Sequence, residues 1–198
     1  MKSPLSLLGA TCALAIGTAS AHAAYLESGD ASNFLAPAQW ATDTTIQGTI
    51  TQGDEGDVYK VVFGSAGTLT ISATSSQIDT NIGLFDAGFK ALAADDDSGG
   101  DLDSLVSVAI GAGTYYIGIG DYAMYAVNAS NQSWFLDGLP PAGFGPVSYI
   151  ANQSSIAAGA YTLSLSMQPV NNAVPEPATL GLLGLGLWGI GMTRRRMA

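Results

Sequence analysis

The sequence predicts an all-β fold, a single antiparallel β-sandwich or barrel, on three observations. The chain between residues 24 and 173 is rich in Gly, Ser, Thr and aromatic or β-branched residues, the composition of strands and turns. Short segments there alternate apolar and polar residues, as a strand with one buried face does. Helical periodicity is almost absent. About 150 residues are enough for one domain with its own core.

Strand signals recur at short intervals from residue 45 onward. Leu69, Ile71 and Ala73 alternate with polar residues, and the last strand repeats this pattern from Tyr161. In chain order, the expected strands are residues 45–51, 58–63, 69–74, 81–85, 90–94, 105–110, 114–120 and 161–167.

Gly- and Asp-rich turns separate these strands. They are residues 53–57, 64–67, 86–88 and 111–113. Glycine reaches backbone conformations that other residues avoid, and Asp bonds to its own backbone, so both favour turns. The spacing of turns and strands is typical of an antiparallel sandwich or barrel.

Two segments do not follow this rhythm. Residues 24–44 are weakly patterned and are expected to be a leader segment that crosses the edge of the sandwich. Residues 122–159 hold several aromatic residues and prolines, and we expect a long insertion in the sandwich of residues 45–170. Its apolar residues either pack as a lid on the sandwich or form an exposed binding patch.

Residues 1–23 predict a secretory signal peptide. Lys2 supplies a positive start, residues 5–16 are apolar, and Ala21 and Ala23 are the small residues that a signal peptidase needs. The apolar stretch is too short to span a bilayer. We expect cleavage after Ala23, with cleavage after Ala21 as the alternative.

The C-terminal segment, residues 171–198, has three ordered parts. These are Pro175, Glu176 and Pro177, then the uncharged residues 178–193, then Arg194, Arg195 and Arg196. A helix over the uncharged part would be about 24 Å long. A bilayer core is about 30 Å thick, so the helix spans it only with local thinning or snorkelling side chains. Positive charge stays cytoplasmic, which orients the arginines inside before processing. A plain membrane anchor is the alternative.

This tail resembles the PEP-CTERM sorting signal. The matching residues are Pro175, Glu176 and Pro177, the Gly- and Leu-rich stretch, and the arginine cluster. The resemblance implies export across the inner membrane of a Gram-negative cell that makes extracellular polysaccharide. It also implies recognition by an exosortase, a membrane protease. The resemblance covers only the tail and implies no activity.

Removal of both ends limits the chemistry of the remaining chain. The sole Cys, Cys12, and the sole His, His22, both lie in the signal peptide. The mature chain therefore has no thiol nucleophile, His base, disulfide or Cys/His zinc site. The remaining chain, residues 24–173 (the body), has two basic residues, Lys60 and Lys90, and 15 acidic residues. Its net charge is therefore about −13. Nucleic acid needs clustered Lys and Arg, so it is excluded as a partner.

The body resembles bacterial pre-peptidase C-terminal domains over residues 45–168. The matching pieces, in order, are Asp57-Val58-Tyr59, Phe63, Leu69, Leu84-Phe85-Asp86, Gly113-Thr114-Tyr115-Tyr116-Ile117 and Ala160-Tyr161-Thr162-Leu163. The resemblance implies a jelly-roll-like sandwich that accompanies secreted proteins and is not itself catalytic. The insertion is the departure from the family pattern.

One dense acidic segment lies between two expected strands. Asp95, Asp97, Asp101 and Asp103 fall on alternate positions of a Gly-containing loop. Calcium takes six to eight oxygen ligands, which such a loop can supply. The loop is not an EF-hand, because Gly99 occupies position five and Val106 occupies position twelve. The alternative is a solvated acidic hairpin. Residues 54–57 form a second, weaker acidic turn.

The sequence therefore predicts an exported, non-catalytic cell-surface or extracellular-matrix protein without a permanent cofactor. Its tail delivers it to the envelope, where we expect association with exopolysaccharide. The alternative function is a calcium-dependent module that binds carbohydrate or protein. Crowded loop carboxylates do not resemble the paired carboxylates of glycosidases, which need a cleft and a defined separation.

Overall fold

The computed structural model describes residues 23–152 and 157–170, and all of its regular secondary structure is β-strand. This confirms the all-β fold. The strands are β1 (Tyr25–Leu26), β2 (Gln39–Trp40), β3 (Thr45–Ile50), β4 (Asp57–Phe63), β5 (Gly67–Thr74), β6 (Thr80–Asp86), β7 (Ala91–Asp95), β8 (Ser104–Ile110), β9 (Gly113–Asp121), β10 (Met124–Asn128), β11 (Ser133–Phe135), β12 (Val147–Asn152) and β13 (Gly159–Pro169).

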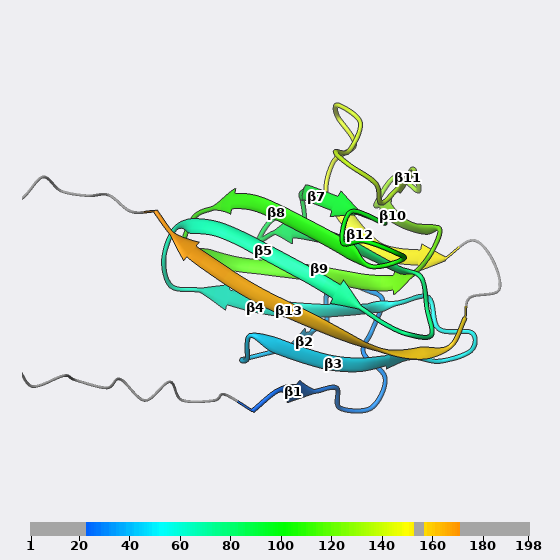
Figure 1. Ribbon diagram of the computed structural model, residues 1–198. Helices are drawn as coiled ribbons and strands as arrows, with labels where there is room; N and C mark the ends of the chain where they lie inside the picture. Colours follow the sequence, from blue (N-terminus) through cyan, green and yellow to red (C-terminus); the bar gives the residue numbers. More distant parts are fainter. Residues whose placement is uncertain (1–22, 153–156, 171–198) are drawn as a thin grey trace, which may run out of the picture.

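Two five-stranded sheets form the sandwich (Figure 1). Sheet I has the order β1-β3-β13-β5-β8, and sheet II has the order β2-β4-β9-β6-β7. The eight long strands, β3 to β9 and β13, pair antiparallel, and each overlaps one of the eight segments expected from the sequence.

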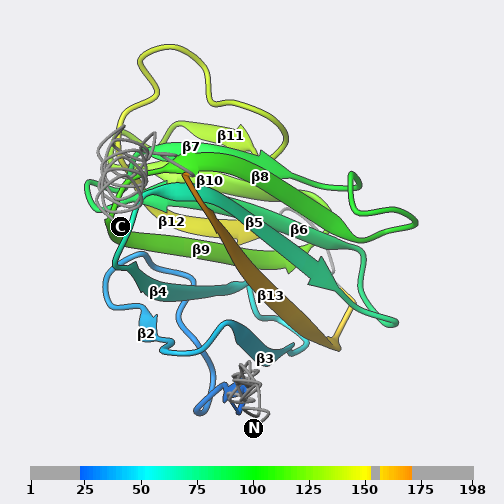
Figure 2. The same ribbon diagram turned by 60° about the vertical axis from the view of Figure 1, so that its left-hand side comes forward.

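The edge strands β1 and β2 correct the expectation of a purely antiparallel sandwich. β1 pairs parallel with β3, and β2 pairs parallel with β4. Both lie in the leader segment, which crosses from one sheet edge to the other (Figure 2). Each has only two residues, too few for an alternating pattern to mark them in the sequence.

The register of the long strands places the apolar residues on one face. In sheet I, Leu69 lies opposite Met167 and Ile71 opposite Leu165. These side chains meet Ile82, Leu84 and Ile117 of sheet II in one buried cluster, the sandwich core. Alternation with Thr and Ser leaves the polar side chains on the outer face of sheet I.

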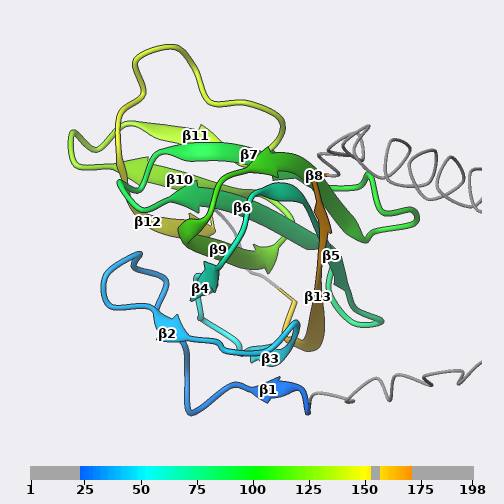
Figure 3. The same ribbon diagram turned by 90° about the vertical axis from the view of Figure 1, so that its left-hand side faces the viewer.

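The insertion folds as a third sheet, with the order β11-β10-β12 (the insertion sheet). It packs against the face of sheet II that points away from sheet I (Figure 3). Phe85 of β6 and Met124, Leu136 and Ile150 of the insertion belong to a second buried cluster, the insertion core. Of the two alternatives for the insertion, the lid is therefore the one observed.

Glycines in sheet II make room for this lid. A Cβ at Gly83 would lie 3.0 Å from Leu136 Cδ2, and one at Gly118 would lie 3.2 Å from Ile150 Cδ1. The insertion sheet therefore approaches the backbone of sheet II closely. As a result, residues Thr80 to Phe85 of β6 are buried on both faces.

Several expectations fall outside the described residues. They concern the signal peptide up to residue 22, which includes Ala21, and the tail with its expected helix over residues 178–193. Ala23 is the first described residue and is exposed. Within residues 23–152 and 157–170, no helix is long and apolar enough to cross a membrane.

Candidate metal centre

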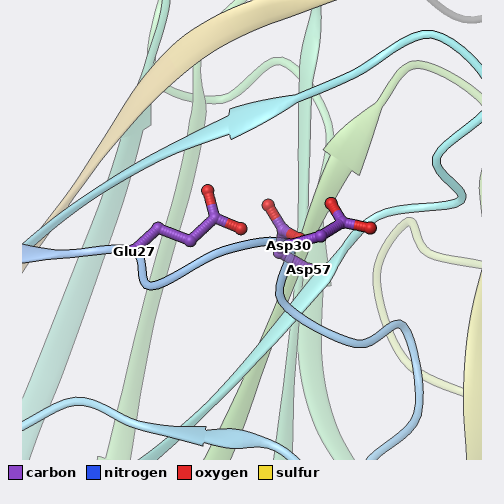
Figure 4. A group of neighbouring side chains, drawn as sticks. All are labelled: Glu27, Asp30 and Asp57. Carbon is purple, nitrogen blue, oxygen red and sulfur yellow. The ribbon is translucent and has the colours of Figure 1, made fainter.

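Three carboxylates from distant parts of the chain meet beside the start of β4. Glu27, Asp30 and Asp57 each offer an oxygen atom, and these oxygens all lie within 4.8 Å of one another. Figure 4 shows the three side chains gathered where the leader segment passes β4. All the donor atoms are carboxylate oxygens, the ligands that Ca²⁺ and Mg²⁺ prefer.

Backbone pairing of the leader segment positions the cluster. The Glu27 N–H donates to the Gln47 carbonyl (2.9 Å), which continues the pairing of β1 with β3. Farther along, the Val58 N–H donates to the Ser32 carbonyl (3.0 Å). These bonds hold the segment that carries Glu27 and Asp30 between sheet I and the first residue of β4, which is Asp57.

Asp57 is completely buried. Its Oδ2 accepts a hydrogen bond from the Tyr161 hydroxyl (2.5 Å), which lies 2.7 Å from the Tyr59 hydroxyl. Its Oδ1 is also buried and has no hydrogen-bond partner. An unpartnered buried oxygen is costly, so the site favours either a proton or a cation on this carboxyl.

The electrostatic surroundings of Asp57 also favour a proton or a cation on its carboxyl. Burial raises the pKa of Asp57 to about 8, and the charges of Glu27, Asp54 and Asp30 add to the rise, against the lowering effect of the Tyr161 hydrogen bond. Burial also raises the pKa of Tyr161, so its hydroxyl stays a donor. Without a cation, burial therefore favours the protonated form of this carboxyl.

Backbone amides orient the neighbouring carboxylates. Glu27 Oε1 accepts from the Ala31 N–H (2.7 Å), and Glu27 Oε2 accepts from the Thr49 N–H (2.8 Å). Asp54, in the turn before β4, accepts from the Gly56 N–H (3.0 Å) through Oδ1, and its Oδ2 is buried without a partner. Burial and the charge of Asp30 raise the pKa of Asp54, although its backbone hydrogen bonds lower it.

The cluster opens onto a polar groove along sheet I. The groove has a volume of about 1030 Å³, and its lining includes Glu27, Asp30, Gln47, Thr49 and Thr162. Three carboxylates fill only part of a calcium coordination shell of six to eight oxygens. The remaining positions can be taken by water or by oxygen atoms of a ligand that lies in the groove.

The residues of the predicted acidic loop have separate roles in the structure. Asp95 Oδ2 accepts hydrogen bonds from the Ser98 and Leu105 N–H groups (3.0 and 2.7 Å). Asp103 Oδ1 accepts one from the Ser75 N–H (3.1 Å). Asp101 is exposed and has a positive φ of 55°. Asp97 joins a different group, with Asp79 and Asp96. Calcium binding by Asp95, Asp97, Asp101 and Asp103 together stays a prediction.

Sequence reasoning did not find Glu27 and Asp30. The acidic turn at residues 54–57 was the one available signal, and it contains Asp57. The two partners of Asp57 lie in the leader segment, which has no strand pattern of its own. The parallel pairing of β1 with β3 and the hydrogen bond between Ser32 and Val58 bring them to Asp57.

The comparison with protein families gives one match. Residues 173–196 carry the PEP-CTERM protein-sorting motif. This match confirms the prediction that the tail is a PEP-CTERM sorting signal. It includes Pro175, Glu176, Pro177 and the three arginines. The motif implies export, processing by an exosortase and sorting to the cell surface. No curated protein sequence matches the chain.

Solved structures with a similar arrangement of strands include the pre-peptidase C-terminal domain of collagenase from Bacillus anthracis (TM-score 0.42, 20% identity, 65% of this chain and 94% of that one covered). Another is PliG, a periplasmic inhibitor of g-type lysozyme from Aeromonas hydrophila (TM-score 0.37, 13% identity, 73% of this chain and 100% of that one covered). A third is CorA, a surface-associated copper-binding protein of Methylomicrobium album BG8 (TM-score 0.32, 11% identity, 66% of this chain and 98% of that one covered). These likenesses are too distant to carry an argument about function.

Proposed function

We propose that this chain is an exported, non-catalytic surface protein whose sandwich binds calcium at Glu27, Asp30 and Asp57 and, through that ion, extracellular polysaccharide. The sorting motif supports export. The observation that carries the calcium site is the buried Asp57 carboxylate, whose Oδ1 has no partner and which lies among two other carboxylates.

The position of the site supports a bridging role for the ion. Glu27 and Asp30 line the groove, and the groove also presents uncharged polar side chains such as Gln47 and Thr49. A calcium ion there would offer open coordination positions to hydroxyl or carboxylate oxygens of a sugar polymer. It would also offset the strongly acidic charge of the body, which otherwise repels anionic polysaccharide.

Other features support a binding protein rather than an enzyme. The body has neither Cys nor His, so a thiol nucleophile and a His general base are missing. Consecutive long strands cross between sheets I and II, except for the pair β6 and β7 in sheet II, which supports the jelly-roll-like topology that the family resemblance implies. In the orientation we propose, Arg194, Arg195 and Arg196 are cytoplasmic until the tail is processed.

Calcium-dependent sedimentation with polysaccharide tests the binding function. The purified full chain is mixed with the exopolysaccharide of the producing cells, with calcium at about 2 mM or with EDTA, and pelleted. We expect co-sedimentation with calcium and at least a tenfold smaller bound fraction with EDTA, because the ion bridges the two partners. An equal fraction in both conditions would contradict the bridge.

A mass measurement tests the proposed processing. Protein recovered from normal cells should lack the arginines of the tail, whereas protein from cells without exosortase should retain them. Replacing Pro175, Glu176 and Pro177 with alanine should give the longer mass in normal cells too. The same mass in all three samples would mean that the tail is a plain anchor.

A further inference from the structure

A second group of carboxylates lies at one end of sheet II, apart from the first cluster. Asp79 immediately precedes β6, and Asp96 and Asp97 immediately follow β7. β6 and β7 pair antiparallel, with Ile82 opposite Asp95. The pairing therefore brings the start of β6 next to the end of β7. Oxygens of Asp79, Asp96 and Asp97 lie within 4.8 Å of one another.

A buried amide provides an independent indication of a ligand. Asn81, in β6, has no exposed surface. Its Nδ2 donates to Asp96 Oδ1 (3.1 Å), so the side chain points at the carboxylate group, and its Oδ1 has no hydrogen-bond partner. Buried amide oxygens are nearly always satisfied. An amide oxygen is also a calcium ligand, and rotation of the amide about its last bond would turn that oxygen towards Asp96.

One of the three carboxylates also has a buried oxygen without a partner. Asp79 Oδ1 is buried without a hydrogen bond. Burial raises the pKa of Asp96 to about 6; the Asn81 hydrogen bond lowers it, and the charges of Asp97, Asp79 and Asp137 raise it. Asp79 also lines a groove of about 600 Å³ together with Asp101, Asp103 and Asp121. The body contains only two lysines, Lys60 and Lys90, to offset this charge.

We propose that Asp79, Asp96, Asp97 and the amide oxygen of Asn81 form a second calcium site, which ties the start of β6 to the loop after β7. The ligand set is hard oxygen only and comes partly from a loop, which suits the adaptable coordination of calcium better than the strict octahedron of magnesium. The site shares no residue with the cluster at Asp57, so an experiment can contradict one of the two proposed sites without contradicting the other.

Calorimetric titration of the full chain with calcium, in detergent, tests the second site. We expect two ions per wild-type chain and one ion per chain for Asp96→Asn. The variant keeps the shape of the side chain and an oxygen for the Asn81 hydrogen bond. Asp57→Asn should also bind one ion, and the double variant none. The matched control is Asp101→Asn in the same loop, which should still bind two.

Three results would overturn the proposal. In the first, Asp96→Asn binds as many ions as wild type. In the second, Asp57→Asn binds none, which would leave the first site standing alone. In the third, Asp101→Asn loses an ion that Asp96→Asn retains, which would move the site to the exposed part of the loop. If Asp96→Asn does not fold, Asp97→Asn replaces it, with the same one-ion expectation.

Discussion

The variant Asp57→Asn is expected to show a smaller calcium-induced rise in melting temperature than the wild-type protein, because it loses one of the two proposed ions. A ligand present at 100 times its dissociation constant stabilises the folded state by about 2.7 kcal/mol. The amide keeps the shape of the side chain and still offers an oxygen to the Tyr161 hydroxyl, but it removes the charge that holds the ion. Melting curves in EDTA and in millimolar calcium measure the effect.

The stability without calcium serves as the control for this variant. In EDTA, Asp57→Asn should be at least as stable as wild type, because it relieves the burial of an ionisable group. The account would be contradicted if calcium raised the melting temperature of both proteins equally. Tyr161→Phe would help to interpret that result, since it removes the hydrogen bond to Asp57 and leaves the three carboxylates in place.

The same carboxyl gives calcium affinity a defined pH dependence. Burial raises the pKa of Asp57 to about 8 in the folded protein, whereas the pKa of an unfolded Asp is about 3.9. The protonated form therefore favours folding below about pH 4, and this contribution is lost as the pH rises through 8. Calcium needs the carboxylate, so its affinity should rise about tenfold per unit between pH 5 and pH 8. An affinity that is constant over this range would contradict the assignment of Asp57 as a ligand.

The variant Phe85→Ala is expected to lower the free energy of unfolding by about 3 to 5 kcal/mol, as deletions of buried aromatic rings do. Phe85 is completely buried between sheet II and the insertion sheet. The neighbouring positions Gly83 and Gly118 have no side chains that could refill the space. Urea unfolding, followed by the intrinsic fluorescence of the protein, measures the loss.

An exposed residue of the same insertion is the matched control. Leu139 is 75% exposed, so Leu139→Ala should change the free energy of unfolding by no more than about 0.5 kcal/mol. Similar small effects of both variants would mean that the insertion sheet does not pack on sheet II, and the lid would have to be abandoned.

The long strands were predictable because their information is local. Alternation around Leu69 and Tyr161 marks one buried face within a few residues, and glycine turns mark the ends. The sorting motif was predictable for the same reason. Strands β1 and β2 have two residues each, which is below the length at which alternation can be recognised.

The sequence could not decide whether the insertion forms a lid or an exposed patch. Its aromatic residues are compatible with both, and the deciding feature lies in another part of the chain, where Gly83 and Gly118 have no side chains and let the insertion approach. The candidate metal centre has the same limitation. The acidic turn that contains Asp57 was visible, but the pairing that brings Glu27 and Asp30 to it is tertiary.

The electron density of crystals grown with calcium tests the central claim most directly. The account predicts an ion between Glu27, Asp30 and Asp57, with carboxylate oxygens at about 2.3 to 2.6 Å. It also predicts further oxygen ligands on the side of the ion that faces the groove. Crystals at saturating calcium with only water among these three carboxylates would contradict it.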